Sequence, residues 1–382
     1  MITQQPGLMD AVRDRFAHVD TCPFEGPRIF FENAGGALHL KSVVKTSGFY
    51  ASLPDNQGRP NVASRALNAA VDKGKADMRL FLNAPRGQVF VGESGSEVLF
   101  RLVRTAALVA DKGGVMLRSS LEHPAMGSSM QRWAEVTDRE LLEVQHDDAT
   151  GTVSLEAYKA LLRPDIRVAS IIHTSPVTGM AVDVPAIAAA IREVAPDALI
   201  IVDGIQHASH GPVDVADYGV DGYALSPYKM FSRHGYGVGW ASDRLSAGPI
   251  EHIIGGPQTN WELGTRDTGA YATFSDVIDY FDWLGTQFTD SDDRRDRLEA
   301  AGRAIAEHEH SLVKAMLQGT GNARGLAEMP GVTLIAGDTL DGREGVVSMR
   351  LDGWDTLKLV EFLGERGVRV HIRKAVNLFK AT

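Results

Sequence analysis

The sequence predicts an α/β protein in which helices cover both faces of a mainly parallel sheet. Short apolar runs alternate with stretches of helical periodicity, and the connections between them have the length of ordinary crossovers. The run Leu-Ile-Ile-Val at 199–202 is apolar and rich in β-branched residues, as expected for a strand buried on both faces. Because 382 residues exceed one simple core, we expect a second, smaller α/β domain at the C-terminal end.

Composition and charge disfavour several classes of protein. The chain carries 39 Lys and Arg against 49 Asp and Glu, a net charge of −10, which disfavours nucleic acid or an anionic membrane as the main partner. A single cysteine, Cys22, rules out a disulfide framework within the chain and the usual cysteine zinc sites, and it fits a reducing compartment. No apolar run approaches membrane-spanning length. We therefore expect a cytoplasmic protein without nucleic-acid or membrane partners.

The elements are expected in a regular order along the chain. Residues 1–39 are expected to pack with the small domain, residues 40–285 to form the large domain and residues 286–382 to form the small one. Strands are expected at 28–31, 88–91, 114–118, 167–172, 199–202, 222–225, 235–239, 331–335, 345–351 and 368–372. Helices are expected at 62–82, 184–194, 292–317 and 356–366, with another that opens after Ser94.

Two residues at the ends of expected strands point to a chemistry. Asp203 directly follows the strand at 199–202, where open α/β sheets place their ligand sites. Lys229 follows the strand at 222–225, and its apolar flank favours an uncharged, nucleophilic amine. Such a pair suits pyridoxal phosphate, because the lysine can form the Schiff base while the acid keeps the pyridine nitrogen protonated. Taken separately, Asp203 could cap a helix and Lys229 could be a solvated loop lysine.

The motifs around these two residues resemble those of a known family. Asp203-Gly-Ile-Gln206-His207 resembles the Asp-x-x-Gln-x motif of the class V aminotransferase and cysteine desulfurase family, and Ser226-Pro-Tyr-Lys229 resembles its Ser-x-His/Tyr-Lys. The similarity runs from about residue 31 to residue 268 and looks most like the cysteine desulfurase-like branch. It implies a fold type I enzyme that acts on an amino acid as a homodimer, with pyridoxal 5'-phosphate as cofactor. The implied catalytic residues are Lys229, His123 and Asp203.

A second motif is typical of a phosphate site. The small residues of Ser94-Gly95-Ser96-Glu97 stand where a strand gives way to a helix, so backbone N–H groups and the helix dipole can hold an anion. Ser94 as N-cap with Glu97 at N3 would also suit an ordinary capped helix, and the two interpretations are compatible. The family's Gly-Ala-Thr-Glu is similar. The resemblance implies cofactor contacts from Ser94, Gly95, Ser96, Ser226 and Tyr228.

Two further segments match the family, one of them with a difference. Glu122-His123-Pro124 is similar to a motif whose histidine stacks on the cofactor ring, although His123 could also cap a helix that begins at Pro124. The loop 173–179 carries Ser175, another implied cofactor contact, but Pro176 stands where the family has asparagine. Gln206 is then the expected partner of the cofactor's phenolic oxygen.

The segment 255–267 resembles a loop that crosses the dimer interface in this family. Thr265 matches the threonine that reaches the phosphate of the neighbouring subunit's cofactor. Asp267 departs from the pattern, because asparagine is common there. Without the resemblance, the segment would be read as a surface loop, although long loops in compact domains are more often functional.

Two patterns suggest other chemistry without completing it. His207-x-x-His210 could begin a metal site, but neither a cysteine nor an added carboxylate in the sequence completes it, so we expect no metal. Gly235-x-Gly-x-Gly239 resembles a dinucleotide fingerprint only superficially, because no convincing helix follows it; a glycine-rich strand is the better interpretation.

The reaction type is less constrained than the cofactor. A cysteine desulfurase also needs a mobile cysteine thiolate, and no cysteine follows Cys22, so persulfide transfer through the usual residue is not expected if 382 residues are the whole chain. The resemblance to the cysteine desulfurase-like branch favours desulfurase-like chemistry or β-elimination from cysteine-like substrates over aminotransfer and epimerisation. A non-catalytic binding protein is the alternative from another class. The family usually adds a further strand and helix with an arginine for the substrate carboxylate. Either Arg369 or Arg373 takes the place of that arginine, or the natural chain continues beyond residue 382 and supplies it.

Overall fold

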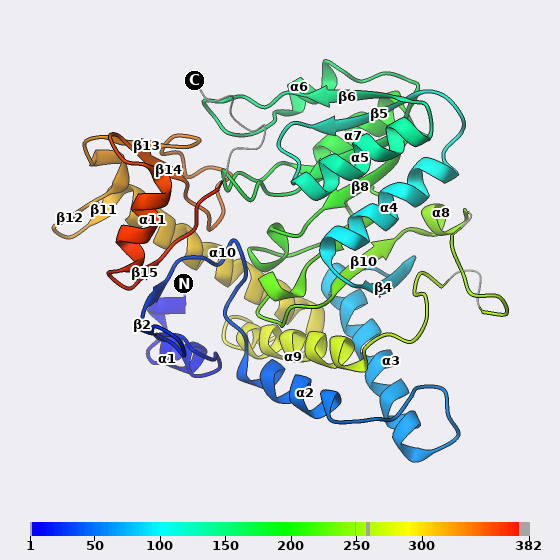
Figure 1. Ribbon diagram of the computed structural model, residues 1–382, viewed down its shortest axis with the longest axis horizontal. Helices are drawn as coiled ribbons and strands as arrows, with labels where there is room; N and C mark the ends of the chain where they lie inside the picture. Colours follow the sequence, from blue (N-terminus) through cyan, green and yellow to red (C-terminus); the bar gives the residue numbers. More distant parts are fainter. Residues whose placement is uncertain (1, 249, 257–259, 374–382) are drawn as a thin grey trace.

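A seven-stranded sheet forms the centre of the computed structural model, which describes residues 2–248, 250–256 and 260–373. Among those residues the strand order is β4-β10-β9-β8-β7-β5-β6 (Figure 1). All neighbours pair in parallel except β10, which is antiparallel to both β4 and β9. The strands are β4 (Gln88–Gly92), β5 (Val115–Ser119), β6 (Glu140–Val144), β7 (Ile166–Ile172), β8 (Leu199–Asp203), β9 (Gly222–Leu225) and β10 (Gly237–Ala241).

Alternating side chains of these strands feed two separate cores. Val89 and Val91 of β4 belong to a cluster on one face of the sheet, whereas Phe90 between them belongs to a cluster on the other. The first face packs against α3 (Val62–Leu82), α7 (Val184–Val194) and α9 (Thr268–Gly285). The second packs against α4 (Gly95–Val109) and α5 (Pro124–Val136). The strands are apolar at successive positions because both faces are covered.

The glycines of β10 allow a helix and a ring to approach the sheet closely. A Cβ at Gly237 would lie 2.4 Å from the carbonyl carbon of Ser94, at the start of α4. A Cβ at Gly239 would lie 2.4 Å from Cζ of Phe90. The glycine-rich strand that the sequence predicts is therefore real, although it begins at Gly237. Gly235 precedes it in a turn with φ of +92°.

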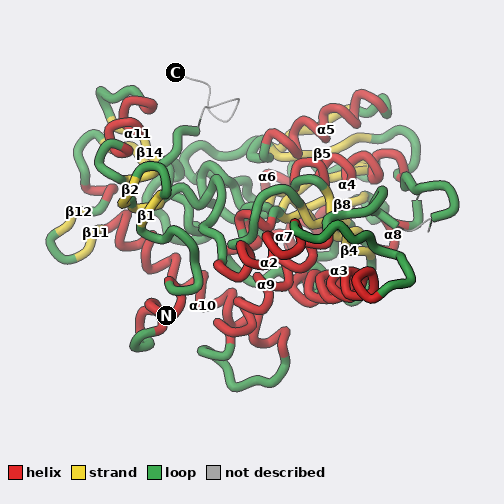
Figure 2. Tube along the Cα trace, turned by 60° about the horizontal axis from the view of Figure 1, so that its bottom comes forward, coloured by secondary structure: helices red, strands yellow, loops and turns green. Residues whose placement is uncertain are grey.

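Helices on the first face form a layer around α9. This helix contacts α3, α2 (Lys41–Ala51) and α10 (Arg294–Gln318), and Figure 2 shows them grouped below the sheet. The other short helical elements before α9 are α1 (Leu8–Arg13), α6 (Leu155–Lys159), α8 (Asp243–Ser246) and the 3₁₀ turns η1 (Ile2–Gln4), η2 (His207–Ser209) and η3 (Pro227–Lys229).

The C-terminal elements lie apart from the main sheet, in orange and red in Figure 1. They are β11 (Gly319–Thr320), β12 (Ala323–Arg324), η4 (Leu326–Glu328), β13 (Val332–Leu334), β14 (Met349–Leu351), α11 (Thr356–Gly364) and β15 (Val368–Arg369). β15 pairs in parallel with β3 (Ile29–Phe30) of the N-terminal segment, which also contains the antiparallel pair β1 (Thr21–Cys22) and β2 (Gly26–Pro27). The elements that end the described chain thus contact those that begin it.

The fold class predicted from the sequence is confirmed, because a mostly parallel sheet is flanked by helices on both faces. The helices predicted at 62–82 and 184–194 have those bounds, as does the strand at 222–225. The strand expected at 345–351 is shorter, since only Met349–Leu351 pairs with β13. Among the described helices, none is both long enough and apolar enough to span a membrane.

Candidate active site

Five segments meet at one edge of the sheet. β4 runs in the same direction as β5, β7, β8 and β9, since β10 is antiparallel to both β4 and β9. The carboxyl ends of these strands therefore share one edge, which is where open α/β sheets bind ligands. The residues that end or follow these strands include the predicted site residues Ser94, His123, Ser175, Asp203 and Ser226.

Lys229 is a buried lysine that contacts another predicted site residue. Only 6% of it is exposed, and its Nζ donates a hydrogen bond of 2.9 Å to Oε1 of Gln206. Burial lowers the pKa of the Lys229 amine to about 8; the charge of Asp203 raises this pKa and that of Arg373 lowers it. The alternative of a solvated loop lysine is wrong. A buried amine that gives up its proton near neutral pH is a nucleophile.

Asp203 supplies a buried carboxylate beside that amine. Its Oδ1 accepts a 3.0 Å hydrogen bond from the backbone N–H of Ile205, which holds the turn that leads to Gln206. Burial raises the pKa of Asp203 to about 6, while this hydrogen bond and the positive charge of Lys229 oppose the rise. Asp203 is therefore largely ionised at neutral pH and can hold a positive partner.

The start of α4 forms a corner with the residue that follows β9. Ser94 is the N-cap, since its side chain accepts from the N–H of Glu97 at 3.2 Å, as the sequence suggests. A Cβ at Gly95 would lie 2.1 Å from Oγ of Ser226 and 2.6 Å from Cδ1 of Ile205, so only glycine lets the helix approach these side chains. The first-turn N–H groups have no carbonyl partner within the helix and suit an anion. Ser96, in this turn, is exposed.

His123 takes the helix-capping role that the sequence allows, and its part in cofactor binding stays a prediction. It is the N-cap of α5, and its Nδ1 accepts a 3.1 Å hydrogen bond from the N–H of Ala125. Burial, together with the positive charges of Lys229 and Arg373, lowers the pKa of His123 to about 4. The ring is thus neutral at physiological pH, and it lies close enough to Lys229 for the charge of Lys229 to affect its pKa.

Tyr228 and Ser175 are placed differently from each other. The ring of Tyr228 stacks on that of His234, with centroids 4.4 Å apart, and burial raises the pKa of its hydroxyl. Ser175 is fully buried, and its Oγ accepts from the N–H groups of Val177 and Thr178 within its own loop. The visible role of Ser175 is to fold that loop.

Two groups near the site were not predicted as members of it. Glu122 is buried beside His123, and its Oε1 accepts a 2.9 Å hydrogen bond from Ser170. Arg373 follows β15, yet its charge acts on Lys229, His123 and Tyr228. The position of Glu122 within the Glu-His-Pro motif was the available signal for it. Arg373 could be named only as one of two alternatives, because its approach depends on the C-terminal elements.

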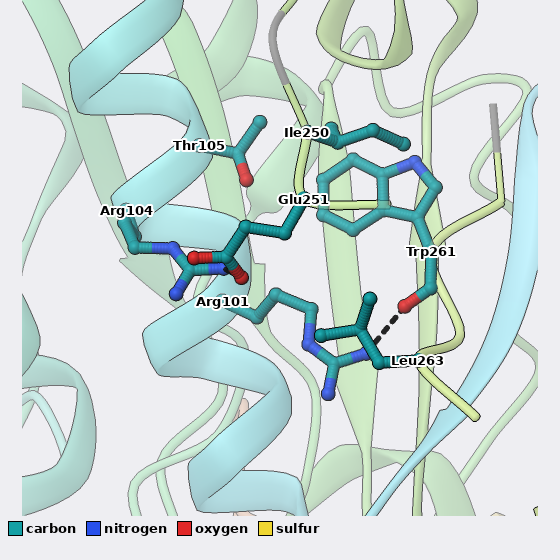
Figure 3. A pocket seen from close by; sticks show the side chains of 7 residues that line it. All are labelled: Arg101, Arg104, Thr105, Ile250, Glu251, Trp261 and Leu263. Carbon is teal, nitrogen blue, oxygen red and sulfur yellow. Dashed lines mark hydrogen bonds and ion pairs between the residues drawn. The ribbon is translucent and has the colours of Figure 1, made fainter. Parts of the chain in front are cut away.

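The segment that carries Thr265 is anchored to α4 and to the edge strand β4. Trp261 stacks on Phe90 with centroids 4.9 Å apart, and Arg101 of α4 donates to its carbonyl oxygen (Figure 3). Next along the chain, Oε1 of Glu262 accepts from the N–H of Val91 at 3.0 Å, on the edge strand β4. Thr265 itself is exposed. Of the loop predicted at 255–267, residues 257–259 lie outside the described part of the chain.

The other end of this loop is fixed by the residue that departs from the family pattern. Asp267 caps α9, because its Oδ1 accepts from the N–H of Gly269 at 2.8 Å. It also pairs with Arg233, which lies four residues after Lys229. Thr265 therefore projects from a loop that is held at both ends.

The two histidines after Gln206 each bind a glutamate. Nδ1 of His207 lies 2.6 Å from Oε1 of Glu344, and Nδ1 of His210 lies 2.6 Å from Oε2 of Glu309 on α10. The sequence singles out both histidines but gives no sign of these partners, which follow them by about one hundred residues or more. No cluster of three metal-binding side chains occurs among the residues that the structure describes.

These residues fit pyridoxal phosphate as a set. The helix start at Gly95 with the hydroxyl of Ser226 suits a phosphate, and a side chain at Gly95 would close that corner. Asp203 is an ionised acid that can pair with a pyridinium, and Lys229 is an amine with a lowered pKa. A site with a purely structural role would not need a buried amine and a buried acid at the same edge of the sheet.

Comparison with known proteins identifies the family of this chain. The family described as Aminotransferase class-V matches residues 29–374. The chain is 26% identical to a probable cysteine desulfurase 2 of Mycobacterium leprae over 79% of this chain and 71% of that protein. It is also 26% identical to a probable cysteine desulfurase of Mycolicibacterium paratuberculosis over 94% of this chain, and it spans about half, 51%, of that longer protein.

A solved structure extends the likeness to the fold. The apo structure of a cysteine desulfurase from Thermococcus onnurineus NA1 superposes with a TM-score of 0.76 over 90% of this chain and 83% of the other, at 20% sequence identity. That identity supports the fold, whereas the family match covers nearly the whole chain and rests on the sequence itself. The chain therefore belongs to the class V aminotransferase family, whose members are enzymes that depend on pyridoxal phosphate.

Proposed function

We propose that Lys229 binds pyridoxal phosphate covalently through Nζ and that the protein acts on the Cα and Cβ of a cysteine-like amino acid. The observation that carries the proposal is the buried contact between Lys229 and Gln206 beside the ionised Asp203. Bound there, the cofactor would supply an electron sink for a negative charge that develops at the substrate Cα. The protein residues would supply binding, proton transfer and orientation.

Each residue has a role that its surroundings support. Asp203 would hold the pyridine nitrogen in its protonated form, and Gln206 would contact the phenolic oxygen. The neutral ring of His123 would lie against the cofactor ring. Gly95, Ser96 and Ser226 would hold the phosphate, with Ser94 fixing the helix start and Tyr228 and Ser175 shaping the wall.

Lys229 would also move the proton at the substrate Cα once the substrate has displaced it. An amine whose pKa is lowered to about 8 is partly unprotonated at neutral pH, so it can accept a proton and return it. The neutral ring of His123, with a pKa of about 4, cannot act as an acid there at neutral pH.

Arg373 would bind the substrate carboxylate. Its charge reaches Lys229 and His123, whereas Arg369 pairs with Glu25 of the N-terminal segment. A guanidinium can hold a carboxylate with two parallel hydrogen bonds. These observations support Arg373 over Arg369 for this role.

Removal of the Cα proton with cleavage of the Cβ–S bond would release sulfide or a thiol, and hydrolysis of the remaining fragment would give ammonia and a 2-keto acid. Cys22 lies in β1, which pairs with β2 and not with the main sheet. We therefore propose that sulfide or a thiol is released directly and that no persulfide forms on Cys22.

Dimerisation would complete the phosphate site through the exposed Thr265 of a second copy. Large apolar side chains stay exposed in α2, at the start of α3 and in the segment that leads to Thr265; they include Phe49, Val62 and Ile254. Exposed apolar side chains of this size favour contact with another protein surface.

The covalent attachment is tested by incubating the protein with pyridoxal phosphate, reducing it with borohydride and mapping the labelled peptide. The label should lie on Lys229. Lys229→Ala should carry none, and Lys159→Ala, which removes an exposed lysine paired with Glu156, should be labelled as the unaltered protein is. A label on another lysine contradicts the assignment, and a protein that stays colourless favours a non-catalytic binding role.

The reaction is tested with a panel of amino acids while sulfide, ammonia and the cofactor spectrum are followed together. Sulfide and ammonia in equal amounts, without any added keto acid, are expected from cysteine-like substrates. Conversion of the cofactor to its amine form, with turnover only after a keto acid is added, would show aminotransfer instead.

A further inference from the structure

A chain of hydrogen bonds leads from Lys229 to helix α10. Nζ of Lys229 donates to Oε1 of Gln206 at 2.9 Å, and Nε2 of Gln206 lies 3.2 Å from Nε2 of His210. Nδ1 of His210 in turn lies 2.6 Å from Oε2 of Glu309. Lys229, Gln206 and His210 are all buried. A group on α10 is thus connected to the amine through one amide and one imidazole.

The chemistry of these atoms fixes where the protons lie. The amide nitrogen of Gln206 can only donate, so Nε2 of His210 accepts and carries no hydrogen. Nδ1 of His210 donates to the Glu309 carboxylate. In this arrangement, which holds at pH values above the pKa of His210, the ring is a neutral imidazole and the amide presents its oxygen to Lys229.

Contact with a cofactor reverses this requirement. The phenolic oxygen of pyridoxal phosphate accepts hydrogen bonds when ionised, so Gln206 must present its N–H groups to it. The amide oxygen of Gln206 then faces Nε2 of His210, which must carry a hydrogen to satisfy it. Because Nδ1 still donates to Glu309, both ring nitrogens are then protonated.

We propose that the Glu309–His210 pair sets the orientation of the Gln206 amide, and that His210 takes up a proton when the cofactor binds. The inference rests on the proposed function, in which Gln206 contacts the phenolic oxygen. His210 and Glu309 are positioning residues that act only through Gln206. A helix outside the main sheet thereby controls a contact to the cofactor.

The charges around His210 favour its protonated form. Burial lowers the pKa of His210, but the charge and hydrogen bond of Glu309 and the charge of Glu344 outweigh burial, so the pKa lies above its ordinary value. The positive charge of Lys229 opposes the protonation, and covalent attachment of the cofactor to Nζ would remove much of that opposition. Gly345 packs against the Glu309 carboxylate, where a Cβ would lie 3.2 Å from Cδ.

The second histidine provides a matched control. His207 is bonded to Glu344 by the same kind of contact, 2.6 Å from Nδ1 to Oε1, and comes from the same turn. Its Nε2 faces the carbonyl oxygen of Pro212 at 3.4 Å, not Gln206. Loss of His207 therefore removes a similar link to the C-terminal elements without touching the amide.

The test measures proton uptake when pyridoxal phosphate binds to the cofactor-free protein. Calorimetry in two buffers of different ionisation enthalpy gives the number of protons, and each variant is compared with the unaltered protein from pH 6 to pH 9. His210→Gln should take up about one proton per site fewer where His210 is otherwise neutral before binding. His207→Gln should match the unaltered protein.

Glu309→Gln gives a second, independent reading. With the carboxylate removed, protonation of His210 becomes harder, so proton uptake should move to lower pH and cofactor binding should weaken about tenfold above that pH. This variant also decides the question if His210→Gln does not fold, which far-UV circular dichroism would reveal.

The outcomes separate this inference from the proposed function. If the unaltered protein binds the cofactor on Lys229 but His210→Gln or Glu309→Gln shows the same proton uptake at every pH, the inference is wrong and the function stands. If the unaltered protein binds no cofactor, the proposed function fails and takes the inference with it. Loss of uptake in His207→Gln as well would mean that any break between these elements has the same effect, which overturns a specific role for His210.

Discussion

Ser170, in β7, donates a hydrogen bond of 2.9 Å to Glu122, and both side chains are buried. Glu122 precedes His123 and lies close enough to Asp203 for their charges to interact. Burial raises the pKa of Glu122 to about 8, and the charge of Asp203 contributes to the rise. Glu122 is therefore largely protonated at neutral pH, whereas Asp203, with a pKa of about 6, is largely ionised. Of the two interacting carboxyl groups, Asp203 is therefore the one that is mostly ionised at neutral pH.

Glu122→Gln should remove a pH-dependent loss of stability. The pKa of Glu122 is higher in the folded protein than its ordinary value of 4.5. Protonated Glu122 therefore makes its full contribution to the free energy of unfolding below pH 4.5, and this contribution is lost as the pH rises through about 8. Glutamine accepts from Ser170 without ionising. Between pH 5 and pH 8.5 the free energy of unfolding of the unaltered protein should fall by up to about 3–5 kcal/mol relative to the variant. Urea denaturation of cofactor-free protein measures this, and parallel curves would refute it; Glu156→Gln, at an exposed position, serves as control.

Lys229 should react with acylating reagents at lower pH than an ordinary lysine. Its pKa is about 8, so in cofactor-free protein the labelling rate should rise with pH through that value. Asp203→Asn removes a negative charge that raises this pKa, so the midpoint should move to lower pH. Competitive labelling followed by peptide mass spectrometry gives the midpoints. A midpoint near 10.5, or an upward shift in Asp203→Asn, would disprove the proposed environment.

Arg373→Ala should weaken substrate binding without preventing cofactor attachment. Loss of a charged pair to the carboxylate should raise KM by about 10–100-fold. Borohydride labelling of Lys229 should persist. A substrate amide, which has no carboxylate, should lose little, and Arg369→Ala is the matched control because Arg369 pairs with Glu25. If the acid and the amide lose activity equally, Arg373 does not bind the carboxylate.

Thr265→Ala should weaken cofactor retention in a way that a second subunit can repair. A charge-assisted hydrogen bond to phosphate is worth about 1.5–3 kcal/mol, so the dissociation constant should rise by about one to two orders of magnitude. In mixed dimers of Thr265→Ala and Lys229→Ala subunits, the site that keeps Lys229 would receive its threonine from the other chain. Tight binding should therefore return in the mixture. Heterodimers that form without restoring it would place Thr265 outside the neighbouring site.

Local signals allowed much of the fold to be predicted. Asn61 and Asp183 cap α3 and α7 through their side chains, and Asn83 ends α3 with φ of 49°, so both helices could be bounded from sequence. Ser94 and His123 are N-caps as their positions suggest. Each of these signals lies within a few residues of the feature that it predicts.

The rest depends on contacts between distant parts of the chain. The strand expected at 345–351 is shortened because the N–H of Glu344 bonds to Gly179 and its side chain to His207, which ties the approach to that strand to the site. No local pattern pairs Glu344 with His207 or Glu309 with His210. The approach of Arg373 to Lys229 also follows from packing, which a single sequence does not specify.

The pairing of β3 with β15 bears on the order in which the molecule is assembled. Arg369 and Glu25, which bridge this junction, are 344 residues apart in the chain. A contact of that separation cannot form until both segments have been synthesised, whereas the sheet and its helices are complete far earlier. On the ribosome, the N-terminal segment must therefore wait for its partner strand, and Arg373 can take its place only after residue 369 has emerged. The part of the site that would hold the cofactor is translated first, and the part that would select the substrate is added to it afterwards.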